Sequence, residues 1–141
     1  MLDDPLLDEA TSRAFAVLAA AGGDLDRLDE LDRTLVIVTS AQGLIDNGGL
    51  RGFFENDFPG TPPYDSFVAA YRHAGAVEVA AAIARAAARY PFRDPHLHVE
   101  RRRDWHAACA ARGERPFEDL DVVACGNEQV WMALARLARG R

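Results

Sequence analysis

Histidine and cysteine are the residues in this chain whose side chains could bind a metal ion. His96 and His98 are separated by one residue. His106 and Cys109 are separated by two residues, and Cys125 stands alone. Imidazole and thiolate are zinc ligands, and a closed zinc site is typically built from two tight ligand pairs. Only His106 and Cys109 form such a pair, so the sequence predicts no metal site and no cofactor, and it favours two buried thiols over a disulfide.

Three consecutive arginines, Arg101–Arg103, stand just before Trp105. An arginine cluster beside an aromatic side chain could bind a phosphate and stack on a base. However, the chain has 22 acidic and 16 basic residues, a net charge of −6, and nucleic-acid binding depends on a basic surface. We therefore expect a solvated helix face here and no direct binding of nucleic acid.

The signatures of common catalytic sites are absent from the sequence. It contains no GxSxG or HExxH motif, no P-loop, and no GxGxxG motif after a strand. Sequence spacing does not bring two carboxylates together as a general acid and a general base, so we assign no catalytic residue. The question of enzymatic activity stays open at this level, and the sequence favours a role other than catalysis.

The negative charge is concentrated in the first quarter of the chain. Residues 1–32 contain nine acidic residues and two arginines, and nine minus two gives a net charge of −7. The remaining residues contain thirteen acidic residues and fourteen arginines, a net charge of +1. Such a segment repels nucleic acid and attracts basic proteins, or else it is the solvated face of two acid-rich helices. The expected interaction surface consists of Asp24, Asp26, Asp29, Glu30 and Asp32.

The segment 46–57, DNGGLRGFFEND, contains two adjacent glycines and two adjacent phenylalanines. Asn-Gly indicates a hairpin only between alternating strands, and here a helical periodicity precedes it. We expect a joint between two helices, with Gly48 in the left-handed conformation and Gly49 allowing close backbone approach. The free N–H groups that begin the second helix can donate to an Asp or Asn side chain.

Phe53 and Phe54 point about 100° apart on that second helix. We expect one ring to anchor the joint and the other to border the surface or a groove. An arginine and two amides around helix ends would suit an anionic ligand, so the joint is also a candidate binding or catalytic site. Its proposed residues are Asn47, Gly48, Gly49, Arg51, Phe54 and Asn56.

Helical periodicity runs through nearly the whole chain. Helices are expected over residues 6–21, about 28–46, 66–74, 76–90, 100–112 and 128–139, besides the short helix after the glycines. The run Leu35–Thr39 is rich in β-branched residues and could form a buried strand, but the sustained 3–4 spacing of apolar residues favours a helix. No repeat or linker marks a second domain. The prediction is an all-α fold, one compact domain of about six to eight helices over residues 1–141.

No stretch of the chain approaches the ~20 apolar residues of a membrane span. The N-terminal sequence MLDDPLLDEA is acidic, unlike a signal or transit peptide. We therefore expect a cytoplasmic protein that makes no membrane contact.

The glycine segment also resembles the motif of a bacterial domain-of-unknown-function family. Residues 47–56, NGGLRGFFEN, are similar to the family pattern Asn-Gly-Gly-Phe-x-Gln-Tyr/Phe-Phe-x-Asn. The best-known member of that family is a DNA-mimic protein that occupies the DNA-binding surface of a transcription factor. The resemblance covers about residues 30–138 and implies an all-α fold. Leu50 stands in place of phenylalanine and Gly52 in place of glutamine, so an activity that needs that glutamine would be lost here.

The residues and the resemblance together predict a protein-interaction module. Its acidic surface would bind a basic or DNA-binding protein, as a DNA mimic does. The alternative is a small domain that binds, or acts on, an anionic ligand at the Asn-Gly-Gly joint.

Overall fold

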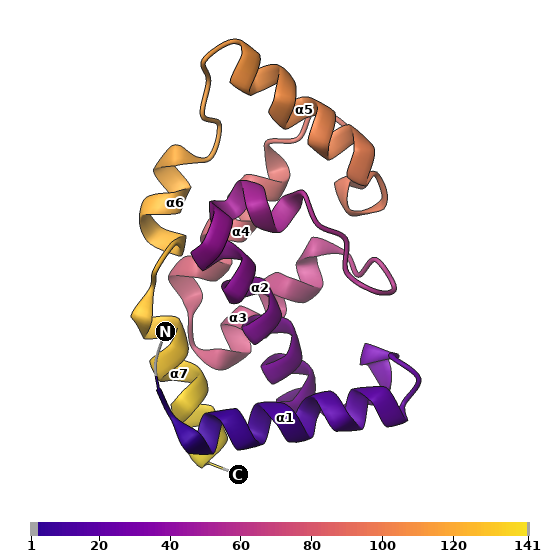
Figure 1. Cartoon of the computed structure of the whole chain (residues 1–141), viewed down its shortest axis with the longest axis vertical. Helices are drawn as coiled ribbons and strands as arrows, with labels where there is room; N and C mark the ends of the chain where they lie inside the picture. The colour runs from indigo at the N-terminus through magenta and orange to yellow at the C-terminus, as the bar shows by residue number, and fades with distance from the viewer. Residues whose placement is uncertain (1–2, 141) are drawn as a thin grey trace.

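The computed structural model describes residues 3–140, and these form seven α-helices and two short 3₁₀ helices, labelled η (Figure 1). In chain order they are α1 (Pro5–Ala20), η1 (Leu25–Arg27), α2 (Glu30–Phe54), α3 (Tyr64–Ala74), α4 (Val77–Ala88), η2 (Pro95–Leu97), α5 (Val99–Ala111), α6 (Glu118–Ala124) and α7 (Glu128–Arg139). The described residues contain no strand. The all-α prediction is therefore confirmed, and the number of α-helices falls within the expected range.

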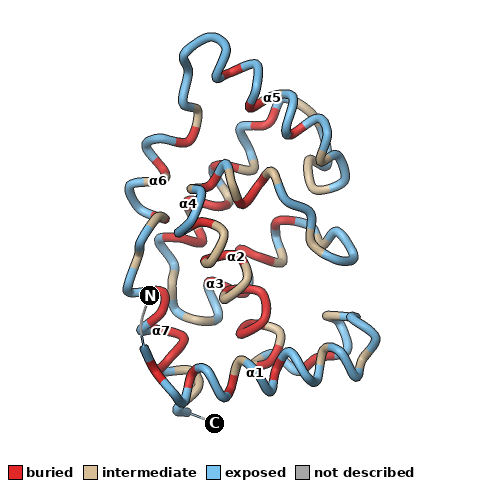
Figure 2. Tube along the Cα trace, in the orientation of Figure 1, coloured by how far each residue is buried: buried red, intermediate tan, exposed pale blue. Residues whose placement is uncertain are grey.

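The long helix α2 lies at the centre of the fold. It contacts α1, α3, α5, α6 and α7, and the buried parts of the chain gather around it (Figure 2). Leu35, Val38 and Ile45 are fully buried at the 3–4 spacing expected for a helix. The run Leu35–Thr39 is helical, since apolar contacts with helices on several sides outweigh the low helix propensity of β-branched residues.

The two ends of the described chain lie side by side, where α1 packs against α7 (Figure 1). The Asp4 carboxylate caps α1 by accepting hydrogen bonds from the N–H groups of Leu6 and Leu7 at 3.0 and 3.1 Å. Its second oxygen accepts a hydrogen bond from Arg139, at the end of α7, at 2.7 Å. Asp4 is buried, so this acidic residue joins the two ends of the bundle and adds little to the surface charge.

Two segments differ from the sequence-based expectation. The helix expected to end near residue 46 continues as α2 to Phe54 and contains a kink at Gly49. The helix α6, Glu118–Ala124, was not predicted. It has only seven residues, too few for a helical period to be recognised in the sequence. Both differences concern the surroundings of the glycine segment, which α6 contacts directly.

Cys109 and Cys125 are free thiols. Cys109 is buried as expected, whereas Cys125 is half-buried. Desolvation, reinforced by the nearby Asp121 carboxylate, raises the pKa of the Cys125 thiol to about 11. Within residues 3–140 no group of histidine, cysteine and acidic side chains is arranged to hold a metal ion, and no helix has the length and apolar character that a membrane crossing requires.

Candidate functional site

The kink in α2 is produced by Gly49 and not, as expected, by Gly48. Gly49 has φ 70° and ψ −175°, whereas Gly48 remains helical. This conformation is open essentially to glycine alone, because a Cβ atom would clash with the backbone. The prediction named the correct pair but the wrong member. The helix keeps its hydrogen bonds for one residue longer than the glycine signal suggested.

The helical segment after the kink begins at Leu50, whose N–H group has lost its place in the preceding helix. This N–H donates a hydrogen bond to Asp121 Oδ1 at 2.8 Å. The expected Asp or Asn acceptor is therefore present, and it comes from α6, 71 residues away along the chain. A Cβ atom on Gly49 would lie 3.2 Å from Asp121 Oδ2. Close approach at Gly49 is confirmed, and the approaching group is this carboxylate.

Both phenylalanines of the motif are core residues. Phe53 is 1 % exposed and Phe54 0 % exposed, so the expectation that one ring would border the surface is wrong. The Phe53 ring packs edge-on against Phe67 of α3, with 5.2 Å between the ring centroids. The Phe54 ring packs against Tyr90 and Phe117, 5.4 Å from each. The two rings lie 4.9 Å apart, both contact Tyr64, and both belong to the same core cluster. Different helices therefore bury both rings although they point apart, and the Phe54 ring packs in the core.

The arginine run Arg101–Arg103 is not simply a solvated face. Arg102 is 1 % exposed, and its guanidinium group donates hydrogen bonds to Phe54 O at 2.6 Å, Asn56 O at 3.2 Å and the Asp57 carboxylate at 2.7 Å. Arg101 and Arg103 are exposed, as expected. Arg102 thus binds the carbonyl groups at the end of α2. Arg102 lies four residues before the buried His106, and His106 lies three residues before the buried Cys109. This helical spacing is the sequence signal that could have revealed the buried face of α5.

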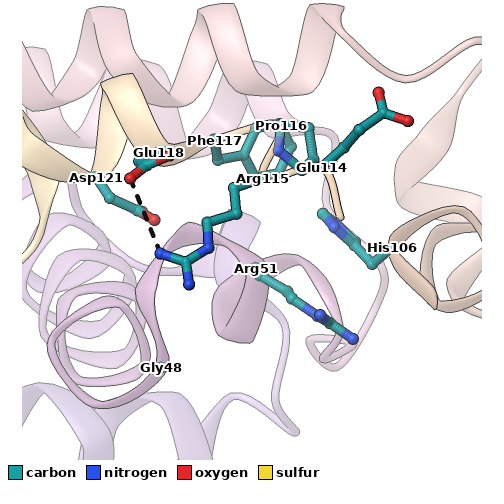
Figure 3. A pocket seen from close by; sticks show the side chains of 9 residues that line it. All are labelled: Gly48, Arg51, His106, Glu114, Arg115, Pro116, Phe117, Glu118 and Asp121. Atoms are coloured by element: carbon teal, nitrogen blue, oxygen red, sulfur yellow. Dashed lines mark ion pairs between the residues drawn. The ribbon is translucent and has the colours of Figure 1, made fainter. Parts of the chain in front are cut away.

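A cavity of about 260 Å³ opens beside the kink, between α2 and the residues before α6 (Figure 3). His106 of α5 forms part of its wall. The ring is 2 % exposed, and its Nε2 atom lies 2.7 Å from the hydroxyl of Tyr90. Burial lowers the pKa of His106 to about 4, so its imidazole is neutral at pH 7. The cavity is lined by Gly48, Arg51, His106, Glu114, Arg115, Pro116, Phe117, Glu118 and Asp121.

The charges around this cavity do not favour an anionic ligand. Three carboxylates and two guanidinium groups line it. Arg51 forms an ion pair with Glu55, and Arg115 lies 3.9 Å from Glu118, the pair marked by the dashed line in Figure 3. The guanidinium groups that would bind an anion therefore already have carboxylate neighbours, and negative groups are in excess.

Only two of the six residues proposed for a site at the joint line this cavity, namely Gly48 and Arg51. Asn47 is exposed outside it. The Asn56 side chain donates a hydrogen bond to the carbonyl oxygen of Gly52 at 2.6 Å and so caps the end of the helix. At this cavity, therefore, the structure does not bring the arginine and the two amides together.

Four of the five residues expected to form an acidic surface are exposed. They are Asp24, Asp26, Asp29 and Glu30, which stand around η1 and the start of α2. The fifth, Asp32, is buried and does not belong to this surface, because it lies on the inward side of the first turn of α2. Its position three residues before Leu35 and four before Val36, both buried, is the sequence signal that could have separated Asp32 from its acidic neighbours.

Helix capping holds two of these carboxylates in place. Asp24 accepts a hydrogen bond from the N–H group of Asp26 at 3.0 Å, and Asp29 accepts one from the N–H group of Asp32 at 2.8 Å. Such caps restrict the side-chain rotamers and place negative charge at the positive ends of helices. The two charges are therefore presented from defined positions at the surface.

A groove runs beside these carboxylates, and we call it the acidic groove. Its narrow part has a volume of about 230 Å³ and lies between α2 and α3. Its wide part has a volume of about 500 Å³ and lies between η1 and the proline-rich loop before α3. The two parts share Asp26 and Ser66. The polar and charged residues along the groove are Asp24, Asp26, Glu30, Arg33, Thr34, Ser66 and His73.

Residues 26–138 match the protein family described as DMP19-like protein. No curated protein and no solved structure matched the chain. The family match spans most of the chain, from Asp26 of η1, through the kink in α2 and its Asp121 partner, to the last helix. The chain therefore belongs to the DMP19-like protein family.

Proposed function

We propose that this protein is a protein-interaction module that binds a basic, DNA-binding protein through the acidic surface formed by Asp24, Asp26, Asp29 and Glu30. Membership of the DMP19-like family, a family of DNA-mimic proteins, supports this proposal. The single observation that carries it is the exposure of these four carboxylates within seven consecutive residues. They lie in the part of the chain that holds all of its negative excess.

A DNA mimic must offer negative charges where a DNA-binding protein expects phosphates. DNA carries one charge about every 1.7 Å along its axis, and basic proteins approach it by electrostatic steering. Capping fixes two of the four carboxylates, so little side-chain entropy is lost when a partner binds them. Arg27 is the one basic residue among residues 24–30, and the local charge therefore stays negative.

The test is a pull-down from an extract of the native cells, in which the immobilised protein retains DNA-binding proteins at low salt. We expect duplex DNA to release the retained proteins, because a DNA mimic and DNA occupy the same surface of the partner. We also expect a higher salt concentration to release them, because salt screens exposed charges and the screening length is about 8 Å already at physiological ionic strength. In a variant that carries D24N, D26N, D29N and E30Q, retention should be lost. Asparagine is as good an N-cap as aspartate, so these changes remove charge and keep the helix starts.

A matched control variant changes four acidic residues elsewhere, D94N, E100Q, D104N and E114Q, which alters the net charge by the same amount. This control should retain the partner. The proposal is wrong if no DNA-binding or basic protein is held at low salt, or if both variants lose the partner equally, since a net-charge effect would then account for the binding.

A further inference from the structure

The narrow part of the acidic groove offers hydrogen-bond acceptors on both of its walls. Asp26 and Glu30 extend from η1 and the first turn of α2, and Ser66 and His73 face them from α3. The Glu30 carboxylate forms an ion pair with the ring of His73 when that ring is protonated. The Asp26 carboxylate has no hydrogen bond or ion pair within residues 3–140, so its negative charge is available to a bound group.

Thr34 is a nearly buried residue of this groove, and its hydroxyl has no protein partner among the described residues. It is 2 % exposed, it lines the narrow part, and its hydroxyl makes no hydrogen bond with any described residue. Thr39, five residues further along α2, shows the ordinary alternative, since its hydroxyl donates to Leu35 O at 2.6 Å. The Thr34 oxygen is not among the described buried atoms that lack a partner, so the hydroxyl still contacts the groove, where water or a bound group completes its hydrogen bonding. Thr34 thus presents a hydroxyl to the groove, and this observation is independent of the acidic residues.

Arg33 also lines the narrow part, and its positive charge offsets one of the two carboxylates there. Its Nε atom donates to Leu25 O at 3.2 Å, and its Nη2 atom donates to Leu28 O at 2.7 Å. The guanidinium group thus holds the η1 turn against α2. Its donors are directed to backbone carbonyls and not to the carboxylates of Asp26 and Glu30.

We propose that the narrow part of the acidic groove binds an arginine side chain of the basic partner. This inference rests on the proposed function and adds the chemistry of recognition. A guanidinium group has five N–H donors in a planar fork, whereas a lysine ammonium has three. The Asp26 carboxylate, the Glu30 oxygen that does not contact His73, and the hydroxyls of Thr34 and Ser66 provide acceptors for the fork. The adjoining wide part, whose walls include glycines and prolines, has room for the extended backbone that carries the arginine.

The test is an NMR titration of the full chain with N-acetyl-arginine amide. The same titration with N-acetyl-lysine amide compares the two cations, and one with N-acetyl-citrulline amide removes the charge. We expect saturable shifts at the amides of residues 26–34 and 66–73, weaker binding of the lysine compound, and no binding of the citrulline compound. Shifts spread over all acidic residues, or equal binding of lysine and arginine, would overturn the proposal.

Variants locate the site. T34V removes the hydroxyl and keeps the shape of the side chain, and we expect it to weaken arginine binding about tenfold, the effect of losing one hydrogen bond to a charged group. The control T39V removes a hydroxyl outside the groove and should bind as the wild type does. D26N, at an exposed position, provides a second variant if T34V does not fold. Unchanged affinity in folded T34V or in D26N counts against the site.

The outcomes separate this inference from the proposed function. If the protein retains its DNA-binding partner but shows no selectivity for arginine, the groove proposal is wrong and the interaction function stands. If the groove binds the arginine compound and no basic partner is retained, the site is real and the proposed function is wrong. Retention of the partner by the wild type and its loss from T34V would support both.

Discussion

At Gly49 a single residue determines the course of the longest helix. Its φ of 70° and ψ of −175° turn the backbone out of the helical conformation. The absence of a side chain lets the Asp121 carboxylate come close enough to accept the hydrogen bond of the Leu50 N–H group. Gly48 has neither feature, since its backbone is helical and a Cβ atom there would have no neighbour within 4 Å. Adjacent glycines therefore have different structural roles.

We predict that G49A destabilises the protein by about 1–3 kcal/mol, the cost of placing a side chain in this region of backbone conformation. The new Cβ atom would also press on Asp121. G48A is the matched control and should leave stability unchanged or raise it by up to about 1 kcal/mol, because alanine is the better helix former. Urea unfolding of both variants measures the difference. Equal stability of the two would contradict the assignment of the kink to Gly49.

The helix α5 packs against the core through a charged residue. Arg102 occupies a buried position on α5 and binds two carbonyl groups at the end of α2 together with the Asp57 carboxylate. Carbonyl groups at the end of a helix have no partner within that helix. Arg102 thus satisfies them and fixes the end of the kinked segment. Arg102 is separated from these two carbonyl groups by 48 and 46 positions in the chain.

We predict that R102M destabilises the protein by about 2–4 kcal/mol, because methionine fills the space but leaves buried carbonyl groups without a donor. R103M is the control. Arg103 is exposed, and although it donates to Glu55 O at 3.0 Å, water can replace that bond. The loss of the Arg103 side chain should lower the free energy of unfolding by less than about 0.5 kcal/mol. Thermal unfolding of the two variants tests this, and a similar loss in both would argue against a special role for Arg102.

The stability of the whole molecule is linked to pH through His106. Burial lowers the pKa of this side chain to about 4, below the ~6.5 of an unfolded histidine. As the pH falls, the unfolded chain therefore binds a proton before the folded protein does. The folded state loses stability from about pH 6.5 down to about pH 4, and it keeps the full contribution of neutral His106 above that window.

We predict that, as the pH falls from 7 to 4.5, proton binding by His106 in the unfolded chain lowers the free energy of unfolding by about 2–3 kcal/mol. Carboxylates that titrate in the same range contribute as well, so the comparison is with H106N, in which the loss should be smaller by that amount. An NMR titration of the His106 ring in the wild-type protein gives an independent value. A pKa near 6.5 for this ring would show that burial does not oppose its charge.

Most of the helices, the glycine pair at the joint and the uneven charge can be read from the amino-acid sequence. Helical periods are local, adjacent glycines interrupt them locally, and the acidic residues can be counted. The tertiary structure decided the rest. It placed the kink at Gly49, buried Phe54, Asp32 and Arg102, and brought Asp121 to Leu50. The conformation of Gly49 and the contact of Asp121 with Leu50 depend on a helix from a distant part of the chain, and local sequence patterns carry no record of that neighbour. The helical spacing around Arg102 marks an inward position, but it does not reveal which carbonyl groups Arg102 binds.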